Sequence, residues 1–294
     1  MKKRGVGVRS IFISIFIIII LPIAYAATAC QDAYISNQDS EHALDITFVS
    51  DNIAGPAQDQ GIKKQIDNLV SVMWLMTPFK EFVDSKINFR YVSSDNLQDL
   101  KCCEVTDSKT FGICNHARVS QLASICQYTD DIIVFSPYGG NEEDGSCSGH
   151  SGVAAGGQHA VLYHAADGST ETSYEILHEL GHSMAFLGDE YLDPERESPS
   201  RKLDFMFVPN CERNPVCENN ICSCPKWRNV AGAGCYKGCT YEEWYRDSDY
   251  DLMRDIYRLP GPVDTLQFRS AMNRYVDYVQ EPISIEINKK LQIL

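Results

Sequence analysis

Apolar and polar positions in the first half of the chain change repeatedly between strand-like and helix-like spacing. Residues 43–50 alternate and carry β-branched side chains, which predicts a strand, and residues 87–92 and 131–135 predict two more. Residues 62–73 and 119–126 have apolar side chains at helical spacing. This order predicts an α/β or α+β fold in which helices pack on a twisted mixed sheet.

The pattern continues through the middle of the chain. Residues 139–157 are rich in Gly, Ser and Asn and predict a loop, and residues 158–163 predict a strand. Residues 168–173 contain the polar signals of a helix start, and residues 174–187 are apolar at helical spacing. Residues 266–279 have the same spacing, so we expect a last helix near the C-terminus.

The N-terminal segment has the order of a targeting signal. A basic stretch, residues 1–9, precedes an apolar run over residues 11–23, and Ala-Tyr-Ala follows. We therefore expect a secretory signal peptide of residues 1–26 and a secreted protein with no stable membrane insertion after cleavage. An uncleaved anchor is the first alternative, although the run is shorter than the ~20 residues of a spanning helix. Lipidation of Cys30 is the second.

Composition and charge narrow the class of protein. The 294 residues include 44% hydrophobic ones and carry a formal net charge of −14. The composition is that of a globular chain, and the acidic balance argues against nucleic acid as a partner.

Cysteine usage agrees with export. The chain has twelve cysteines, an even number that indicates disulfides in a secreted protein. Six of them lie between Cys211 and Cys239, where apolar periodicity is weak. A structural zinc knot is the alternative for this segment, but it contains no Cys-x-x-Cys pair, so we favour disulfides. The spacing leaves their pairing open.

One short motif carries chemistry. His178-Glu179-Leu180-Gly181-His182 is a His-Glu-x-x-His sequence within the helix expected over residues 174–187. Two residues four apart on a helix lie on the same face, so both imidazoles point the same way. Imidazole nitrogens bind Zn²⁺, and the adjacent Glu179 can act as general base. The motif predicts a zinc site with its own base.

A catalytic zinc needs a third protein ligand. Asp189 lies seven residues after His182, about 10 Å further along if the helix continued. We therefore expect the helix to stop at Gly188, which can adopt positive φ at little cost, and the returning chain to bring Asp189 to the metal. Glu190 is the alternative third ligand. Two outside candidates lie in the following loop: Glu195 and Glu197.

The other acidic and histidine residues give weaker evidence for a functional site. Asp247, Asp249 and Asp251 alternate like the start of a Ca²⁺ loop, but Leu252 occupies the glycine position and Arg258 the final glutamate position, so an EF-hand is rejected. The remaining histidines have no ligand spacing with the motif, and we expect surface or core roles for them: His42, His116, His150, His159 and His164.

The residues around the motif resemble a known family. The sequence HELGHSMAFLGDEY, residues 178–191, resembles the active-site signature of the immunoglobulin A peptidase-like zinc metallopeptidases, and weaker patches extend over residues 43–255. The family is similar to the broader metzincin group, so the resemblance implies a metzincin-like zinc endopeptidase. The chain departs from the metzincin pattern at Ala185, where that group has Gly, and at Gly188, where it has the third ligand.

The resemblance also implies supporting roles. Met253 resembles the methionine turn beneath the zinc, with a plain core methionine as the alternative. Tyr191 and Tyr250 are candidates to assist at the oxyanion. The resemblance further implies an edge strand that binds an extended peptide as an additional strand, with three residues on it: Gly157, His159 and Val161.

Together these observations predict a secreted zinc endopeptidase that uses one Zn²⁺ and acts on a protein or peptide substrate. We expect a short linker, residues 27–42, and one peptidase domain, residues 43–294, with an upper subdomain over 43–188 and an irregular, disulfide-rich lower subdomain over 189–294. A non-catalytic, zinc-stabilised binding module and a zinc hydrolase of non-peptide amides are the alternatives. Cys30 is a minor candidate for a thiolate that blocks the zinc.

Overall fold

The structure is a computed structural model that describes residues 29–36, 40–93, 97–102, 114–137, 152–154, 159–192, 208–219 and 221–275. The α-helices and strands, in chain order, are β1 (Ala29–Ile35), β2 (Leu44–Ser50), α1 (Pro56–Leu75), α2 (Val83–Lys86), β3 (Ile87–Ser93), α3 (His116–Ala123), β4 (Asp131–Phe135), β5 (Gly152–Ala154), β6 (Ala160–Leu162), α4 (Thr170–Ser183), β7 (Cys211–Glu212), β8 (Val216–Glu218), β9 (Ile221–Ser223), β10 (Tyr236–Cys239), β11 (Tyr241–Arg246) and α5 (Pro262–Asn273). Short 3-10 helices lie at Ser40–His42, Phe79–Glu81 and Pro225–Trp227.

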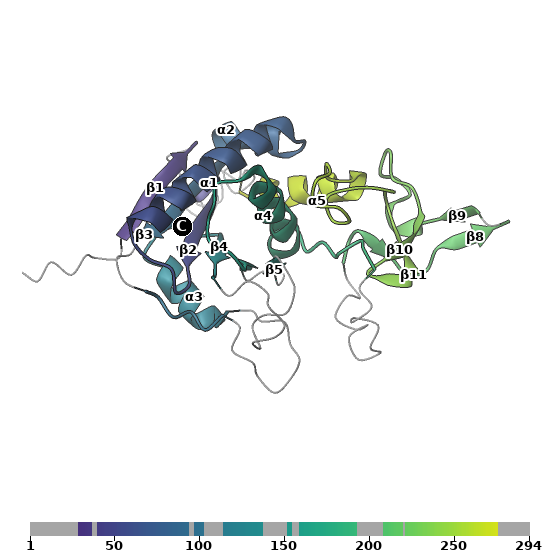
Figure 1. The fold of residues 1–294 in the computed structure, drawn as a ribbon. Helices are drawn as coiled ribbons and strands as arrows, with labels where there is room; N and C mark the ends of the chain where they lie inside the picture. Colours follow the sequence, from purple (N-terminus) through teal and green to yellow (C-terminus); the bar gives the residue numbers. More distant parts are fainter. Residues whose placement is uncertain are drawn as a thin grey trace, which may run out of the picture.

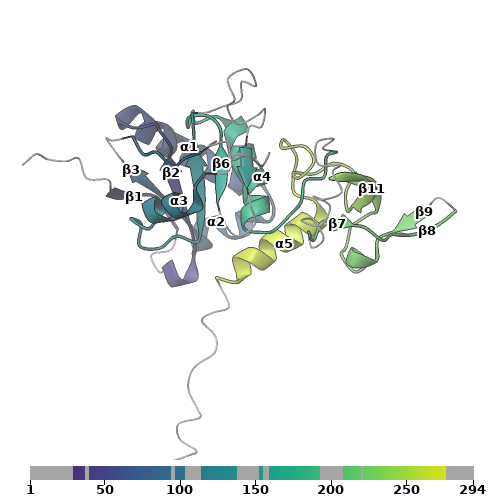
Figure 2. The same cartoon turned by 90° about the horizontal axis from the view of Figure 1, so that it is seen from below.

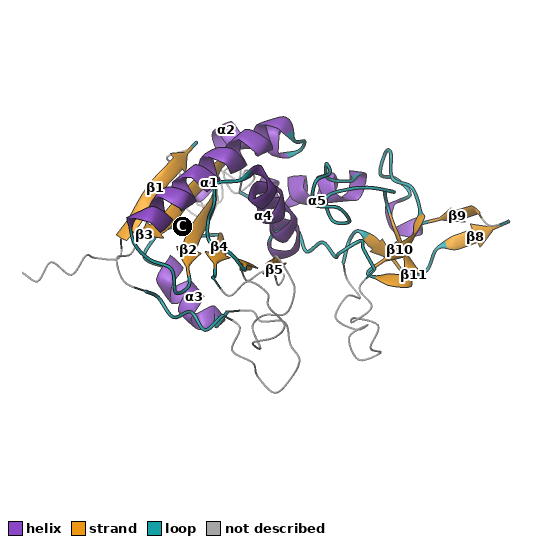
Figure 3. Ribbon diagram, viewed as in Figure 1, coloured by secondary structure: helices purple, strands orange, loops and turns teal. Residues whose placement is uncertain are grey.

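A mixed sheet organises the first half of the molecule (Figures 1 and 3). Its strand order is β1-β3-β2-β4-β6-β5. The four inner strands are parallel, whereas β1 and β5 pair antiparallel at the two edges. The predicted strands over residues 43–50, 87–92 and 131–135 are confirmed, and the mixed α/β class with them.

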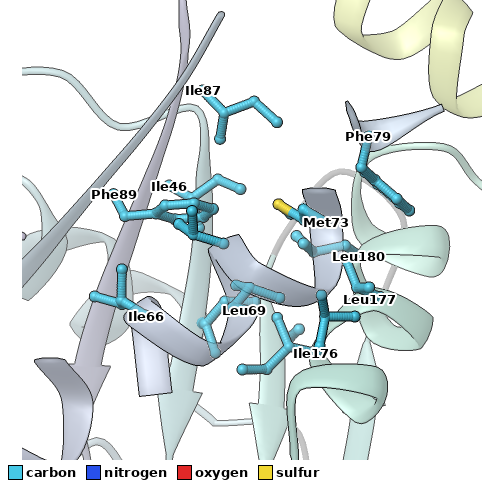
Figure 4. Packing of buried hydrophobic residues seen from close by; sticks show 14 of the residues in the cluster. Ile46, Ile66, Leu69, Met73, Phe79, Ile87, Phe89, Ile176, Leu177 and Leu180 are labelled. Atoms are coloured by element: carbon cyan, nitrogen blue, oxygen red, sulfur yellow. The ribbon is translucent and has the colours of Figure 1, made fainter. Parts of the chain in front are cut away.

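Helices cover both faces of this sheet. The larger core lies between the sheet and the helices α1 and α4, where Phe89 of β3, Leu69 of α1 and Leu177 of α4 are buried in one cluster (Figure 4). A smaller core forms where α3 covers the opposite face, with Val119 packed near Val134. The layers are therefore helix, sheet, helix, and α4 takes its position from the larger core.

The sheet begins earlier in the chain than the sequence predicts. Residues 27–42 were expected to be a linker, but β1 lies within them and pairs with β3. Its side chains are exposed or half-buried, as an edge strand allows, so it lacks the apolar signal of a buried strand. Cys30 forms a disulfide with Cys126, which corrects both the lipidation of Cys30 and its role as a zinc-blocking thiolate.

The described residues from Asp189 onward are here called the Cys-rich half, and their strands extend away from the six-stranded sheet (Figure 1). It contains a three-stranded sheet in the order β10-β11-β7 and the hairpin β8–β9. All six cysteines of this half are paired, so disulfides rather than a zinc knot are confirmed there: Cys211–Cys239, Cys217–Cys222 and Cys224–Cys235.

The helix α5 connects the Cys-rich half to the larger core (Figure 2). It begins at Pro262, one turn before the predicted start, and residues 276–279 of the predicted helix lie outside the described part of the chain. Phe268 packs edge-on against Phe79 with ring centroids 4.7 Å apart, and Arg269 pairs with Glu81. These contacts fix α5 against the 3-10 helix Phe79–Glu81, which follows α1.

The cross-links indicate the redox environment. Within the described residues there are five disulfides, including Cys102–Cys114, and such a number is typical of an oxidising environment. No helix in the described ranges is sufficiently long and apolar to cross a membrane. The predicted signal peptide, residues 1–26, lies outside those ranges.

Candidate functional site

The helix α4 carries the His-Glu-x-x-His motif, and its first turn is well capped. The Ser169 hydroxyl accepts a hydrogen bond from the Thr172 N–H at 3.1 Å, and Gln65 of α1 donates to the Ser173 hydroxyl at 2.8 Å. The apolar face of α4, which includes Leu177 and Leu180, is buried in the larger core. The remaining face presents both motif histidines towards the Cys-rich half.

The helix ends earlier than predicted. It stops at Ser183, and Phe186 adopts positive φ at 56°. The Leu187 N–H then donates to the Gly181 carbonyl oxygen at 2.9 Å, which closes the turn. Gly188 as the helix stop was therefore wrong. Its missing side chain serves packing instead, because a Cβ there would lie 3.2 Å from a Val208 methyl group.

A buried asparagine holds the chain after this turn. Asn210 accepts a hydrogen bond from the Gly188 N–H and donates to the Gly188 carbonyl, both at 2.8 Å. It also donates to Glu190 Oε1 at 3.1 Å, and the Asp189 carbonyl accepts from the Thr240 hydroxyl. Asp189 is thus fixed on both sides. Neither hydrophobic periodicity nor a motif marks Asn210 in the sequence.

Three ligand-type atoms meet at this point. Asp189 Oδ1 lies 3.1 Å from Nε2 of His178 and 3.1 Å from Nε2 of His182, and the two Nε2 atoms are 3.2 Å apart. The two imidazole planes are at 89° to each other. These three side chains form a group that could hold a metal ion. Of the two candidate third ligands, Asp189 lies with the histidines, whereas Glu190 lies in a second acidic group.

The opposite ring nitrogens explain why this group would attract a cation. Nδ1 of His178 lies 2.9 Å from the Leu252 carbonyl oxygen, and Nδ1 of His182 lies 2.7 Å from the Leu187 carbonyl oxygen. A carbonyl oxygen only accepts, so each Nδ1 carries the hydrogen. In the neutral rings both Nε2 atoms then present lone pairs towards the Asp189 carboxylate, and a cation would relieve this crowding of acceptors.

A methionine lies directly under the helix. Met253 is fully buried, and a Cβ at Gly181 would lie 2.6 Å from its Sδ atom. The preceding residue, Leu252, supplies the carbonyl oxygen that orients His178. The turn that contains Met253 therefore supports α4 at the metal-ligand group.

The expected base and the tyrosines lie around this group. Glu179 is buried, and its charge, after burial itself, contributes to a raised pKa of the Tyr163 phenol at the end of β6. Tyr163 therefore lies near Glu179, and the sequence alone did not indicate this tyrosine. The Tyr191 ring lies nearly parallel to that of His178, with centroids 6.5 Å apart. Tyr250 instead is exposed and packs against the guanidinium of Arg254.

The expected substrate strand differs from the observed edge of the sheet. Val161 is fully buried in β6, which pairs with β4 on one side and β5 on the other. His159 is buried and stacks on His116, with ring centroids 5.5 Å apart. Residues 159 and 161 therefore do not form an edge, because part of the Gly-rich segment folds back as β5 and occupies it. Gly157 lies outside the described residues, as do Glu195 and Glu197.

Comparison with known proteins adds no assignment: no protein-family model matches the sequence, and no curated protein matches it.

Proposed function

We propose that the protein is a secreted zinc endopeptidase with a metzincin-like fold. The observation that carries the proposal is the convergence of His178 Nε2, His182 Nε2 and Asp189 Oδ1 next to Glu179. Two imidazoles and one carboxylate make a three-ligand set, which is typical of catalytic rather than structural zinc. The five described disulfides agree with a secreted protein.

The spacing of the three atoms fits zinc. Ligand atoms at ~2.0–2.1 Å from a tetrahedral ion lie about 3.3–3.4 Å from one another. The observed separations of 3.1–3.2 Å need to widen by only a few tenths of an ångström. Both histidines have their second nitrogen oriented by a main-chain carbonyl oxygen, as is usual for metal-binding histidines. His178, His182 and Asp189 would therefore hold the ion.

The chain's own residues account for proton transfer. When bound, zinc would supply Lewis-acid activation of water and of the scissile carbonyl. Glu179 follows His178 directly on α4 and is buried. Its carboxylate would accept the proton of the attacking water and pass it to the leaving amine nitrogen. Tyr191, whose ring lies beside His178, is the better placed of the two tyrosine candidates to contact the reacting carbonyl.

Substrate binding would use the sheet edge next to the helix. The strand β5 is the last in the sheet order and packs against α4. It pairs only through its inner side, with β6, in the described structure. An extended peptide could add to its outer side by main-chain hydrogen bonds, which would place the peptide along the metal-ligand group. This moves the proposed binding strand from residues 157–161 to residues 152–154.

The test compares the base with a nearby acid. The disulfide-bonded protein, Glu179→Gln and Glu175→Gln are incubated with a diverse peptide mixture, and zinc is counted in each by elemental analysis. We expect one zinc per chain in all three, and cleavage that Glu179→Gln lowers by about 10²–10⁴-fold. Glu175→Gln, one turn earlier on α4, should retain activity.

Other outcomes would redirect the proposal. Absence of zinc from the wild type contradicts the metal site. Zinc without cleavage of any peptide favours a non-catalytic binding module, or a hydrolase of non-peptide amides if such compounds are cleaved.

A further inference from the structure

Four acidic side chains are buried together on the far side of the Asp189 turn. Glu190 follows α4, Asp247 and Asp251 follow β11, and Asp264 lies in the first turn of α5. Their exposed fractions are 1%, 0%, 1% and 0%. We call these residues the carboxylate cluster. Buried carboxylates are rare without a counter-charge, so the cluster requires an explanation.

The side chains are close enough to share one ligand. Glu190, Asp251 and Asp264 each present a ligand oxygen, and these atoms lie within 4.8 Å of one another. Asp247 joins the same space, because a Cβ at Gly261 would lie 2.8 Å from Asp251 Oδ2 and 3.3 Å from Asp247 Oδ2. Glycine at position 261 thus leaves room beside both carboxylates.

Hydrogen bonds hold one oxygen of each of three carboxylates and leave the other without a partner. Glu190 Oε1 accepts from Asn210, Asp247 Oδ2 from the Val263 N–H at 2.7 Å, and Asp264 Oδ2 from the Gly261 N–H at 3.1 Å. The second oxygens, Glu190 Oε2, Asp247 Oδ1 and Asp264 Oδ1, are buried with no hydrogen-bond partner. Main-chain N–H groups orient Asp247 and Asp264, and the Asn210 side chain orients Glu190, but none of the three carboxylates is fully satisfied.

Basic side chains do not supply the missing charge. Among the described residues, Arg246 and Arg254 pair with Asp249, which is 58% exposed, and no ion pair reaches the carboxylate cluster. Burial, and then the charges of Asp251 and Asp247, raise the pKa of Asp264 above its usual range. The charged form of the cluster is therefore costly unless a cation binds.

We propose that Glu190, Asp247, Asp251 and Asp264 bind a Ca²⁺ ion. Calcium takes six to eight oxygen ligands and accepts irregular geometry, which suits four carboxylates of which three have an unpartnered oxygen. Zinc prefers nitrogen and sulfur ligands, so the two metal groups of the molecule would select different ions. The site is not a loop of the EF-hand type; it is assembled from three separate segments of the Cys-rich half.

The ion would join these segments next to the zinc group. Glu190 is the neighbour of Asp189, and its N–H donates to the Met253 carbonyl oxygen at 2.9 Å. Asp251 accepts from the Met253 N–H at 3.1 Å. Calcium would thus fix residues 189 and 190 against the turn that contains Met253 and against the start of α5. The proposal does not depend on peptidase activity, because its evidence lies outside the zinc group.

The test measures calcium binding with the zinc group kept filled. The disulfide-bonded protein is stripped with chelator, reloaded with one equivalent of zinc, and titrated with CaCl₂ by calorimetry, and the Tm is followed in parallel. We expect one Ca²⁺ per chain and a Tm that rises with calcium concentration. Asp247→Asn and Asp264→Asn should each weaken binding by at least tenfold. Asp249→Asn, in the same acidic run, should bind as the wild type does.

Two results would overturn the proposal. One is a wild type that binds no Ca²⁺ and whose Tm does not respond to it. The other is calcium binding that persists unchanged in both cluster variants. If the variants do not fold, the wild-type titration alone decides. A Tm that rises in Asp264→Asn with no response to calcium in the wild type would mean that protons neutralise the cluster.

Discussion

The hydrogen bonds from Nδ1 of His178 and His182 to main-chain carbonyl oxygens determine what their opposite nitrogens can do. They fix both imidazoles in the tautomer that binds a metal through Nε2. Neither carbonyl oxygen belongs to a residue that the motif specifies, so the chain around the motif completes the site. Asn210 has the same kind of role for Asp189, because it holds the main chain of Gly188 on one side and the Glu190 carboxylate on the other.

The first prediction at this scale concerns Asn210. Asn210→Ala removes three hydrogen bonds that hold residues 188–190, and we expect zinc affinity to fall by about 10–100-fold, as for other groups that orient ligands. Competition with a chromophoric chelator at fixed calcium concentration measures the effect. Asn214→Ala, an exposed change in the same segment, is the control. Unchanged zinc affinity in folded Asn210→Ala would show that Asp189 needs no such support.

The second prediction at the residue scale concerns Asp131, which is buried and accepts a hydrogen bond from the Ser183 hydroxyl at 2.7 Å. Burial raises its pKa from the ordinary value of 3.8 to about 7. The folded state therefore holds this proton more tightly than the unfolded state does, and stability falls as the pH rises from about 4 to about 7. Asp131→Asn should reduce this fall.

Urea unfolding of the wild type and Asp131→Asn at pH 5 and pH 8 measures this fall in the free energy of unfolding. Asp67→Asn, an exposed change on α1, should keep the wild-type dependence. An equally steep fall in Asp131→Asn would assign the dependence to another group.

At the scale of elements, the disulfides differ most in the length of chain they enclose. Cys30–Cys126 ties the edge strand β1 to the end of α3 across a sequence separation of 96, whereas Cys217–Cys222 closes the β8–β9 hairpin with a separation of 5. Chain entropy makes the longer link the more stabilising one. Replacing both cysteines by serine should lower the free energy of unfolding by about 4–5 kcal/mol for the first pair and about 2 kcal/mol for the second.

Urea unfolding of the two double variants provides the comparison. Equal losses would mean that strain or residual structure, rather than loop length, controls the stability. The hairpin pair also serves as the control for removing two sulfur atoms.

The sequence predicts some of these elements well and others not at all. The strands β2 and β4 are buried along their whole length and the helices α1 and α4 along one face, so apolar, β-branched runs and helical spacing reveal them. The edge strand β5 has three residues, and β1 is exposed or half-buried, so both lack that signal. The His-Glu-x-x-His group is local and could be recognised. The fold brings Asn210 to the Asp189 segment and brings the carboxylate cluster together from distant segments, so residue spacing in the sequence does not predict either.

At the scale of the whole molecule, the metal-ligand group lies where the sheet half, which comprises the described residues before Asp189, continues into the Cys-rich half. His178 and His182 belong to α4, Asp189 follows the turn, and Leu252 reaches His178 from the other half. Binding of zinc to this group should therefore stabilise both halves together. At a free zinc concentration of 100 times Kd, we expect a gain of about 2.7 kcal/mol in the free energy of unfolding.

A thermal unfolding series at increasing zinc concentration tests this. His182→Ala, which removes one ligand, should lose the dependence at the same concentrations. A Tm that does not change with zinc in the wild type would mean that the ion does not bind the folded state preferentially.

None of the five described disulfides joins the two halves: Cys30–Cys126 and Cys102–Cys114 lie in the sheet half, and the other three lie in the Cys-rich half. A small rotation of one half against the other would consequently strain none of these five disulfides and, in the described part of the chain, disturb only reversible contacts. In the proposed endopeptidase, such freedom would ease the entry and departure of a long polypeptide substrate. The placement of the cross-links would then govern turnover without touching the reaction itself.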